Sequence, residues 1–245
     1  MAKQKGLKAY EDRYQAVFAA GALHWNDPRP NPHLSRLLNQ LREHSDCIEF
    51  GCGEGYQARL IASQGHTVTG IDLSPTAIAK AIRETPPELQ IRFLVGDVTD
   101  VSSLHLTGRN YDLVVDIGCL HMMAENDDRA NYLNLVCNLL RRGGKFFLQN
   151  GLDLDDVYPQ SEDEAKELAE LRALQAEPAG HPAPRKIVTA SGLREISIPL
   201  CPPCRMLSLN EYSRELATHG FRVLTAERTA GVNCRFEMFI VAERS

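Results

Sequence analysis

The sequence lacks the features that mark membrane-spanning or disulfide-rich proteins. No apolar run approaches the roughly 18 residues that a membrane span requires, and no apolar signal core follows the basic residues 1–5. The seven cysteines are an odd number, and most lie inside apolar segments, which favours buried thiols over a disulfide framework. We therefore expect a cytoplasmic protein without a membrane partner.

The chain also lacks a basic cluster. It holds 27 Lys and Arg against 32 Asp and Glu, for a net charge of −5, and its densest basic stretch is the pair Arg141-Arg142. Proteins that bind nucleic acid usually gather positive charge on one face, so we expect no nucleic-acid partner. The 245 residues, 43% of them hydrophobic, are enough to bury a sizeable core.

Strand and helix patterns alternate between residues 46 and 150, which predicts an α/β fold with a parallel sheet. Ser74 and Pro75 are a typical helix start, and further helices are expected over 58–62, 128–142 and 209–219. The last two strands have a short connection, which predicts an antiparallel hairpin at the sheet edge. The sequence thus predicts a Rossmann-like, mostly parallel seven-stranded sheet, with strands at 47–50, 67–71, 91–95, 112–117, 145–148, 221–227 and 236–242.

Two segments fall outside this pattern. Residues 1–45 precede the first strand, and residues 152–207 hold an acidic helix near 161–176, several prolines and a possible strand at 196–200. A connection this long in a compact domain is usually functional, so we expect both segments to act as lids. The remainder of 46–245 forms the main domain, interrupted by the 152–207 insert.

A glycine-rich turn, Glu49 to Gly55, follows the first strand directly and precedes a helix. Glycines let the backbone turn sharply and approach a ligand closely, and the helix start offers free N–H groups. Asp72 ends the next strand, where a carboxylate can accept hydrogen bonds from ribose hydroxyls. These parts predict a nucleoside pocket. Tyr56 occupies the third position of the dinucleotide fingerprint, which argues against a pyrophosphate there.

This turn resembles the first motif of class I S-adenosylmethionine-dependent methyltransferases. Gly96-Asp97-Val98, residues 111–117 and the turn 140–144 resemble later segments of that family. By resemblance, the glycines face the methionine part of the cofactor, Asp72 binds ribose, and Asp97 and Val98 flank adenine. The full set that we expect to contact S-adenosylmethionine comprises Trp25, Glu49, Gly51, Cys52, Gly53, Gly55, Asp72, Leu73, Asp97, Val98 and Asp116.

The stretch from Asp116 to Met123 resembles methyltransferases that act on small molecules, notably thiols, halides or oxyanions. His121 could be a general base, with Asp116 as its catalytic neighbour, or simply a histidine bonded at a helix start. Trp25 resembles a tryptophan that folds over the cofactor in the same group, although it could merely pack on the sheet edge. Cys119 is expected to be a buried apolar residue.

Cys201-Pro202-Pro203-Cys204 allows redox or zinc readings, but its place in the insert and the lack of further ligands disfavour both. The two prolines resemble a segment that walls the substrate pocket of thiol and thiopurine methyltransferases. Asp153, Asp155 and Asp156 are expected to be solvated, so we predict no metal.

The resulting hypothesis is methyl transfer to a small acceptor, with a thiol or heterocyclic nucleophile favoured. A thiol has a pKa near 8.5, so a modest base such as His121 could supply the thiolate. Nitrogen or oxygen acceptors remain alternatives, as do a nicotinamide-dependent reductase and a non-catalytic cofactor-binding module. The sequence carries no signal for the oligomeric state.

Overall fold

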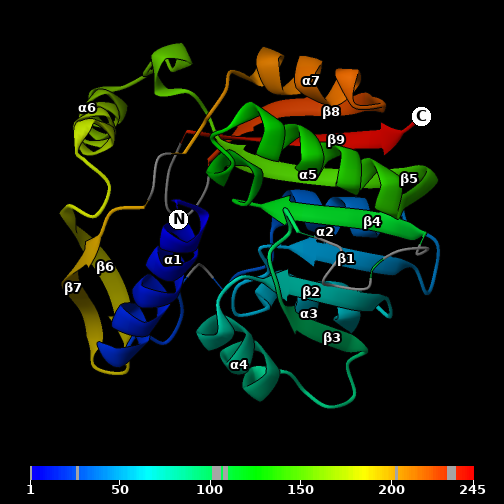
Figure 1. The fold of residues 1–245 in the computed structure, drawn as a ribbon, viewed down its shortest axis with the longest axis horizontal. Helices are drawn as coiled ribbons and strands as arrows, with labels where there is room; N and C mark the ends of the chain where they lie inside the picture. The colour runs from blue at the N-terminus through cyan, green and yellow to red at the C-terminus, as the bar shows by residue number, and fades with distance from the viewer. Residues whose placement is uncertain (1, 26–27, 101–105, 107–109, 202–203, 231–235) are drawn as a thin grey trace.

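The computed structural model describes residues 2–25, 28–100, 106, 110–201, 204–230 and 236–245. Within these residues, an α/β sheet with helices on both faces forms the centre, and a smaller group of elements lies beyond one end of it (Figure 1). None of the described helices has the length and apolar character to cross a membrane.

The central sheet has seven strands within the described residues, in the order β3-β2-β1-β4-β5-β9-β8. Strands β1 to β5 pair in parallel, whereas β9 runs antiparallel to both β5 and β8. The predicted parallel sheet with an antiparallel C-terminal hairpin is therefore confirmed. The strands are β1 (Asp46–Phe50), β2 (Thr67–Asp72), β3 (Ile91–Val95), β4 (Tyr111–Ile117), β5 (Leu140–Gly151), β8 (Phe221–Thr229) and β9 (Glu237–Arg244).

Side chains alternate between two cores, one on each face of the sheet. On β4, Val114 packs in the core that contains Tyr132 and Leu216, whereas Leu113 and Val115 pack in the opposite core. Because helices cover both faces, the central strands bury apolar side chains on each face. The first core contains residues of α5 (Asn126–Leu139) and α7 (Leu209–Thr218), and the second contains residues of α2 (Pro32–Leu38) and α3 (Tyr56–Ser63).

The predicted strands and helices are present, although most of their ends are shifted. Ser74 caps α4 (Pro75–Glu84) by accepting from the Ala77 N–H, with Pro75 in the first turn. The predicted helix 128–142 is wrong at its end, because α5 stops at Leu139 and β5 begins at Leu140. Arg141 donates to the buried carboxylate of Asp112, and the strand pairing shifts register there, so the arginine and glycine stretch belongs to an irregular strand start.

The N-terminal segment and the insert meet beyond the carboxyl ends of the parallel strands. Helix α1 (Ala2–Ala19) lies beside a two-stranded sheet formed by β6 (Pro182–Thr189) and β7 (Gly192–Pro199) (Figure 1). Helix α6 (Glu162–Ala176) precedes this sheet in the insert. Val17, Ile187 and Ile198 form a third core here. The expected strand at 196–200 is thus part of a longer hairpin. Its other strand was missed because two prolines lie in it. Strand β6 tolerates them because they lie near its start, away from Thr189, which also pairs with Ala22.

Candidate cofactor and acceptor site

The glycine turn needs glycine at three positions. Gly51, Gly53 and Gly55 have φ values of 68°, 53° and 78°, in the left-handed region that other residues rarely adopt. A Cβ would lie 3.0 Å from the Cβ of Cys119 at Gly51 and 2.7 Å from the Cζ of Phe93 at Gly55. The turn is therefore packed closely on both sides, and only a backbone without side chains fits.

Asp72 joins the end of β2 to this turn. Its carboxylate accepts from the backbone N–H of Gly53 at 2.8 Å and from that of Ser74 at 2.8 Å. Burial raises the pKa of Asp72, and the backbone hydrogen bonds oppose that rise. Leu73 follows and is half-buried. The structure thus brings together the turn and the acid that the sequence reasoning paired.

Asp97 and Val98 follow β3 on the same side. Asp97 accepts from the Thr99 N–H at 2.8 Å and from its hydroxyl at 2.6 Å, and Val98 is buried. Burial raises the pKa of the Cys119 thiol, and the charges of Asp116, Asp72 and Asp97 raise it further. The three predicted carboxylates are therefore near enough to Cys119 for their charges to act on its thiol.

Glu49 and Cys52 are part of the turn segment, and their side chains are buried in the protein interior. Burial raises the pKa of Glu49 to about 8, and the backbone hydrogen bond from Ala58 opposes that rise. Its Oε2 atom has no hydrogen-bond partner within the described residues. The Sγ atom of Cys52 lies against Gly70, where a Cβ would be only 3.0 Å away. Both side chains support the turn from below.

Trp25 reaches the same turn from the N-terminal segment. Its backbone N–H donates to Oε1 of Glu54 at 2.6 Å, and its ring centroid lies 4.6 Å from that of Tyr14. The Tyr14 hydroxyl lies 2.9 Å from the place where a Cβ on Gly53 would be. Tyr14 and Glu54 were not predicted. Nothing local in α1 marks Tyr14 as a neighbour of Gly53, and nothing in the turn marks Glu54 as a partner of Trp25.

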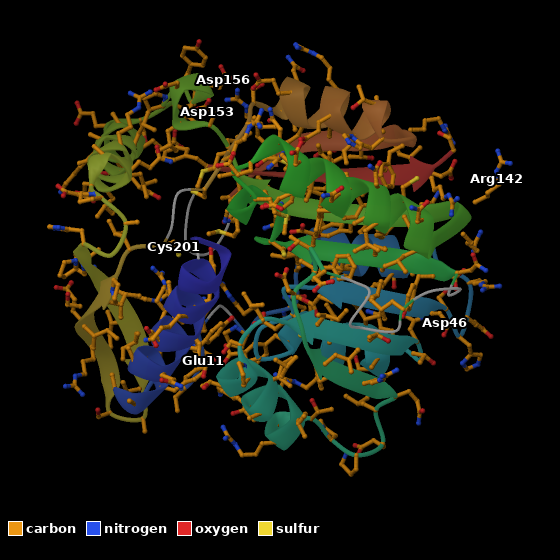
Figure 2. The ribbon with its side chains drawn as sticks, viewed as in Figure 1. Glu11, Asp46, Arg142, Asp153, Asp156 and Cys201 are labelled. Carbon is orange, nitrogen blue, oxygen red and sulfur yellow. The ribbon has the colours of Figure 1, made fainter. Side chains whose placement is uncertain are left out.

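Glu11 fastens α1 to the sheet domain. Its carboxylate accepts from the Ser74 hydroxyl at 2.5 Å, from the Thr76 N–H at 3.3 Å and from the Thr76 hydroxyl. Figure 2 labels Glu11 on α1, the helix that approaches α4. These are the first residues of α4, where helix N–H groups favour a negative charge. The hydrogen bonds lower the pKa of Glu11 against the effect of burial.

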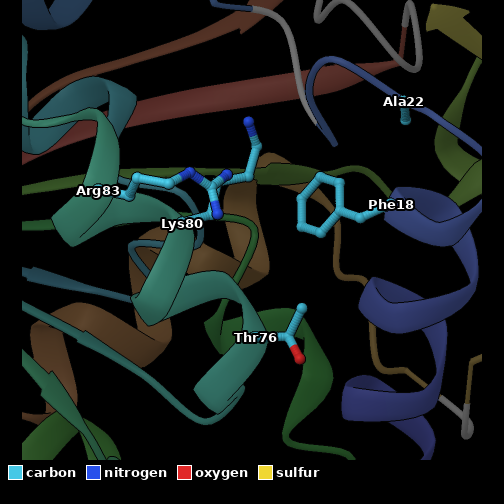
Figure 3. A pocket seen from close by; sticks show the side chains of 5 residues that line it. All are labelled: Phe18, Ala22, Thr76, Lys80 and Arg83. Atoms are coloured by element: carbon cyan, nitrogen blue, oxygen red, sulfur yellow. The ribbon is translucent and has the colours of Figure 1, made fainter.

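A cavity of about 320 Å³ lies between α1 and α4, next to this contact. Phe18, Ala22, Thr76, Lys80 and Arg83 line it (Figure 3). The Nζ atom of Lys80 lies 5.2 Å from the centroid of the Phe18 ring and 3.5 Å from Oε2 of Glu54. Lys80 thus links α4 both to α1 and to the glycine turn.

Asp116 ends β4 and is fully buried. It accepts from the N–H groups of Cys119 and Leu120, each at 2.8 Å, and from the Tyr132 hydroxyl at 2.6 Å. Burial raises its pKa to about 6 against these hydrogen bonds. Its carboxylate holds the backbone that leads into the short helix η2 (Leu120–Met122), and thereby sets the position of His121.

His121 is held by Asn150 at the end of β5. The Asn150 amide donates to Asp116 at 3.4 Å, which leaves its Oδ1 to accept from Nδ1 of His121. Within the described residues, Nε2 of His121 then has no hydrogen-bond partner and is the basic nitrogen. Burial lowers the pKa of His121 to about 4, with Asn150 opposing and the charge of Arg129 assisting. The ring is therefore neutral at pH 7.

Arg129 ties this region to α7. Its Nε donates to Glu215 at 2.5 Å, and its Nη1 donates to the Leu120 carbonyl at 3.1 Å. The arginine side chain is 1% exposed and that of Glu215 is 18% exposed, so this is a largely buried ion pair. No sequence signal singled out either residue, since they are far apart in the chain.

Cys201 and Cys204 are half-buried, and Pro202-Pro203 lie outside the described residues, so their predicted role as a pocket wall stays a prediction. The six cysteines in the described part of the chain are all unpaired. No group of three His, Cys, Asp or Glu side chains within that part could hold a metal ion.

The comparisons with known proteins agree with this geometry. Residues 47–144 match the family described as "Methyltransferase domain". The chain is 27% identical over 150 residues to the 2-heptyl-1-hydroxyquinolin-4(1H)-one methyltransferase of Mycobacteroides abscessus, an alignment that covers 59% of this chain and 65% of that protein. It is 33% identical over 114 residues to an uncharacterised methyltransferase of Schizosaccharomyces pombe, covering 46% of this chain and 76% of that protein.

A solved structure shares the fold at low identity. The Burkholderia thailandensis 1,6-didemethyltoxoflavin-N1-methyltransferase, with 1,6-didemethyltoxoflavin and S-adenosylhomocysteine bound, superposes with a TM-score of 0.56 and 20% sequence identity, over 88% of this chain and 77% of that one. The chain belongs to the class I S-adenosylmethionine-dependent methyltransferases. It is an enzyme of that class, with S-adenosylmethionine as its cofactor, as the sequence predicted.

Proposed function

We propose that the enzyme methylates a small heterocyclic acceptor, either on a ring nitrogen or on the oxygen of a hydroxyl group attached to the ring. The observation that carries the proposal is a neutral His121 with one basic nitrogen, held by Asn150 beside the glycine turn. The names of two relatives support the acceptor class, since one acts on a hydroxyquinolinone and the other on the N1 position of a didemethyltoxoflavin.

The residues at the turn fit the cofactor. At its three glycines the turn has no side chains, and the Asp72 carboxylate accepts from the Gly53 N–H at 2.8 Å. Gly51, Gly53 and Gly55 would lie along the methionine part, Asp72 would accept from the ribose hydroxyls, and Asp97 and Val98 would border adenine. When bound, S-adenosylmethionine supplies an activated methyl group on a positively charged sulfur.

The protein has little covalent chemistry to perform. A displacement of this kind depends on alignment of the acceptor with the methyl group and on exclusion of water. Helix α1, Trp25 and the β6–β7 hairpin would provide that enclosure as lids. His121 would accept a hydrogen bond, or the leaving proton, from the acceptor at Nε2, while Asp116 acts through Asn150 as a positioning residue.

The lowered pKa of His121 bears on the acceptor. A base with a pKa of about 4 is a poor match for a thiol with a reference pKa of about 8.5, so it would generate very little thiolate at pH 7. A ring nitrogen with its own lone pair, or an acidic ring hydroxyl, needs much less help. A thiol therefore ranks second among the acceptors that we propose.

The test measures methyl transfer from labelled S-adenosylmethionine to matched panels of quinolones, ring-nitrogen heterocycles, phenols, thiols, halides and tRNA. We expect product with hydroxylated or nitrogen heterocycles, and His121→Gln should lower kcat at least tenfold with little change in cofactor affinity. The matched control is His219→Gln, on the helix α7 side of the molecule. Product from tRNA alone, or from thiols alone, would refute the proposed acceptor class.

A further inference from the structure

Two arginines from distant parts of the chain meet on one aromatic ring. Arg13 comes from α1 and Arg185 from β6, and both guanidinium groups lie near the indole of Trp25. Their Cζ atoms are 5.3 Å and 4.0 Å from the ring centroid, respectively. The two lid segments thus place two positive charges at one point.

Within the described residues, the hydrogen-bond acceptors of both arginines are backbone carbonyls. Arg13 donates to the Pro199 carbonyl and Arg185 donates to the Trp25 carbonyl at 2.6 Å, so each has a neutral partner. Neither forms an ion pair within 4.0 Å among the described residues. Arg13 is only 8% exposed, and its buried Nε has no hydrogen-bond partner in the part of the chain that the structure describes. Burial lowers the pKa of Arg185 and the charge of Arg13 lowers it further, as expected for neighbouring like charges, whereas the charge of Glu54 opposes this shift.

The pair lies between the two halves of the proposed site. On one side, Trp25 and Tyr14 connect it to Glu54 and Gly53 of the glycine turn. On the other side, both guanidinium charges act on the Cys201 thiol and lower its pKa against the effect of burial. An anion bound to the pair would therefore be close to either the cofactor or the acceptor.

We propose that Arg13 and Arg185 form a binding site for a carboxylate, supplied by the amino-acid part of S-adenosylmethionine or by the methyl acceptor. A guanidinium group is planar and donates two parallel hydrogen bonds to a carboxylate, and burial strengthens such a contact. This inference rests on the proposed function, because it assumes that both ligands bind beneath the lids. Binding of the anion would also stabilise the closed arrangement of the lids, because it would neutralise two positive charges that lie together only when α1 and β6 meet.

The experiment compares ligand pairs that differ by one carboxylate. The cofactor pair is S-adenosylmethionine and decarboxylated S-adenosylmethionine, measured by calorimetry. The acceptor pair is 4-hydroxyquinoline-2-carboxylate and 4-hydroxyquinoline, measured by KM. The variants are Arg13→Met, Arg185→Met and Arg185→Lys, with melting temperatures to verify folding. Arg194→Met is the control, because Arg194 is exposed and also donates to a carbonyl across the same contact, that of Ala20.

We expect each Met variant to weaken one carboxylate ligand at least tenfold and its partner without the carboxylate less than threefold. Arg185→Lys should recover part of the loss, and Arg194→Met should change neither ligand. Loss confined to the cofactor pair assigns the site to the methionine carboxylate, and loss confined to the acceptor pair assigns it to the acceptor. Equal effects on both members of each pair, or no effect, would overturn the inference. Failure of the wild type to bind S-adenosylmethionine would instead refute the proposed function.

Discussion

The glycine turn and the two proposed lids are held by contacts of different range along the chain. The Gly53 to Asp72 hydrogen bond spans 19 residues, and the glycines are fixed by their own backbone conformations. Contacts of the lids and of the acceptor side span 65 residues for Glu11 with Thr76, 86 for Arg129 with Glu215 and 160 for Arg185 with Trp25.

This difference has a physical consequence. Local backbone constraints persist whatever the rest of the protein does, so the cofactor half should be rigid. The proposed lids depend on a small apolar core and a few polar contacts between separate segments, and such regions open with lower free energies than the main core. The contrast between the two regions can be tested by substitutions in each.

The largest effect is expected from Arg129→Met. Removal of the arginine leaves the carboxylate of Glu215 without its partner, which should cost about 3–5 kcal/mol in the free energy of unfolding. Urea unfolding measures this cost. The control is Arg222→Met, which breaks an ion pair with Glu243 in which the arginine is 66% exposed, and should cost less than about 1 kcal/mol. Similar losses of stability in the two variants would contradict a stabilising role for the buried ion pair between Arg129 and Glu215.

Gly55→Ala should be the next largest. The variant places a Cβ 2.7 Å from Phe93 at a left-handed φ of 78°, so we expect a loss of about 2–4 kcal/mol together with loss of cofactor binding. Gly65→Ala is the matched control, since its φ is 87° but nothing lies within 4 Å of its Cβ. It should show only the backbone cost of about 1–2 kcal/mol. Equal losses would mean that the close packing of the turn has no energetic weight.

Glu49→Gln tests the buried acid beneath the turn through its pH dependence. The folded protein keeps a proton on Glu49 up to a pKa of about 8, whereas the unfolded chain releases it near its usual value. Stability from this group is therefore present at low pH and lost as pH rises through 8. Glu49→Gln should stabilise the protein by about 1–3 kcal/mol at pH 9 and have little effect at pH 4. Thermal melts of both proteins between pH 4 and pH 9 measure this difference. An effect of the substitution that is independent of pH would contradict the raised pKa of Glu49.

The smallest effect is expected from Glu11→Gln, which weakens the hold of α1 on α4. Loss of the charged acceptor should favour local opening by about 1 kcal/mol, which corresponds to roughly fivefold faster trypsin cleavage within α1. Asp12→Asn is the control, because Asp12 pairs only with the exposed Lys8 on the same helix among the described residues. Unchanged cleavage in Glu11→Gln would mean that other contacts hold the lid.

The same contrast explains how much the sequence could predict. Strand β3 and the Ser74 cap have local signals, and the structure has them as expected. The glycine turn and Asp72 have local signals too, but the hydrogen bond from Gly53 to Asp72 was not predicted. Glu11, Tyr14, Asn150 and Arg185 had none, because their partners lie on other elements and become neighbours only in the fold. Strand β6 was not predicted for a related reason. A proline-containing sequence is compatible both with a loop and with a strand whose prolines pair on one side only, so the sequence pattern does not distinguish them.

The central claim is that the glycine turn and Asp72 bind S-adenosylmethionine, and calorimetry with Asp72→Ala tests it most directly. The wild type should bind S-adenosylmethionine and S-adenosylhomocysteine with micromolar Kd and give no heat with nicotinamide dinucleotides. Asp72→Ala should weaken binding by about 1–3 kcal/mol, since hydrogen bonds to a charged acceptor are lost. Asp46→Ala, at the opposite end of the sheet, should bind as the wild type does (Figure 2). Absence of heat in the wild type, or equal affinity in Asp72→Ala, would contradict the account.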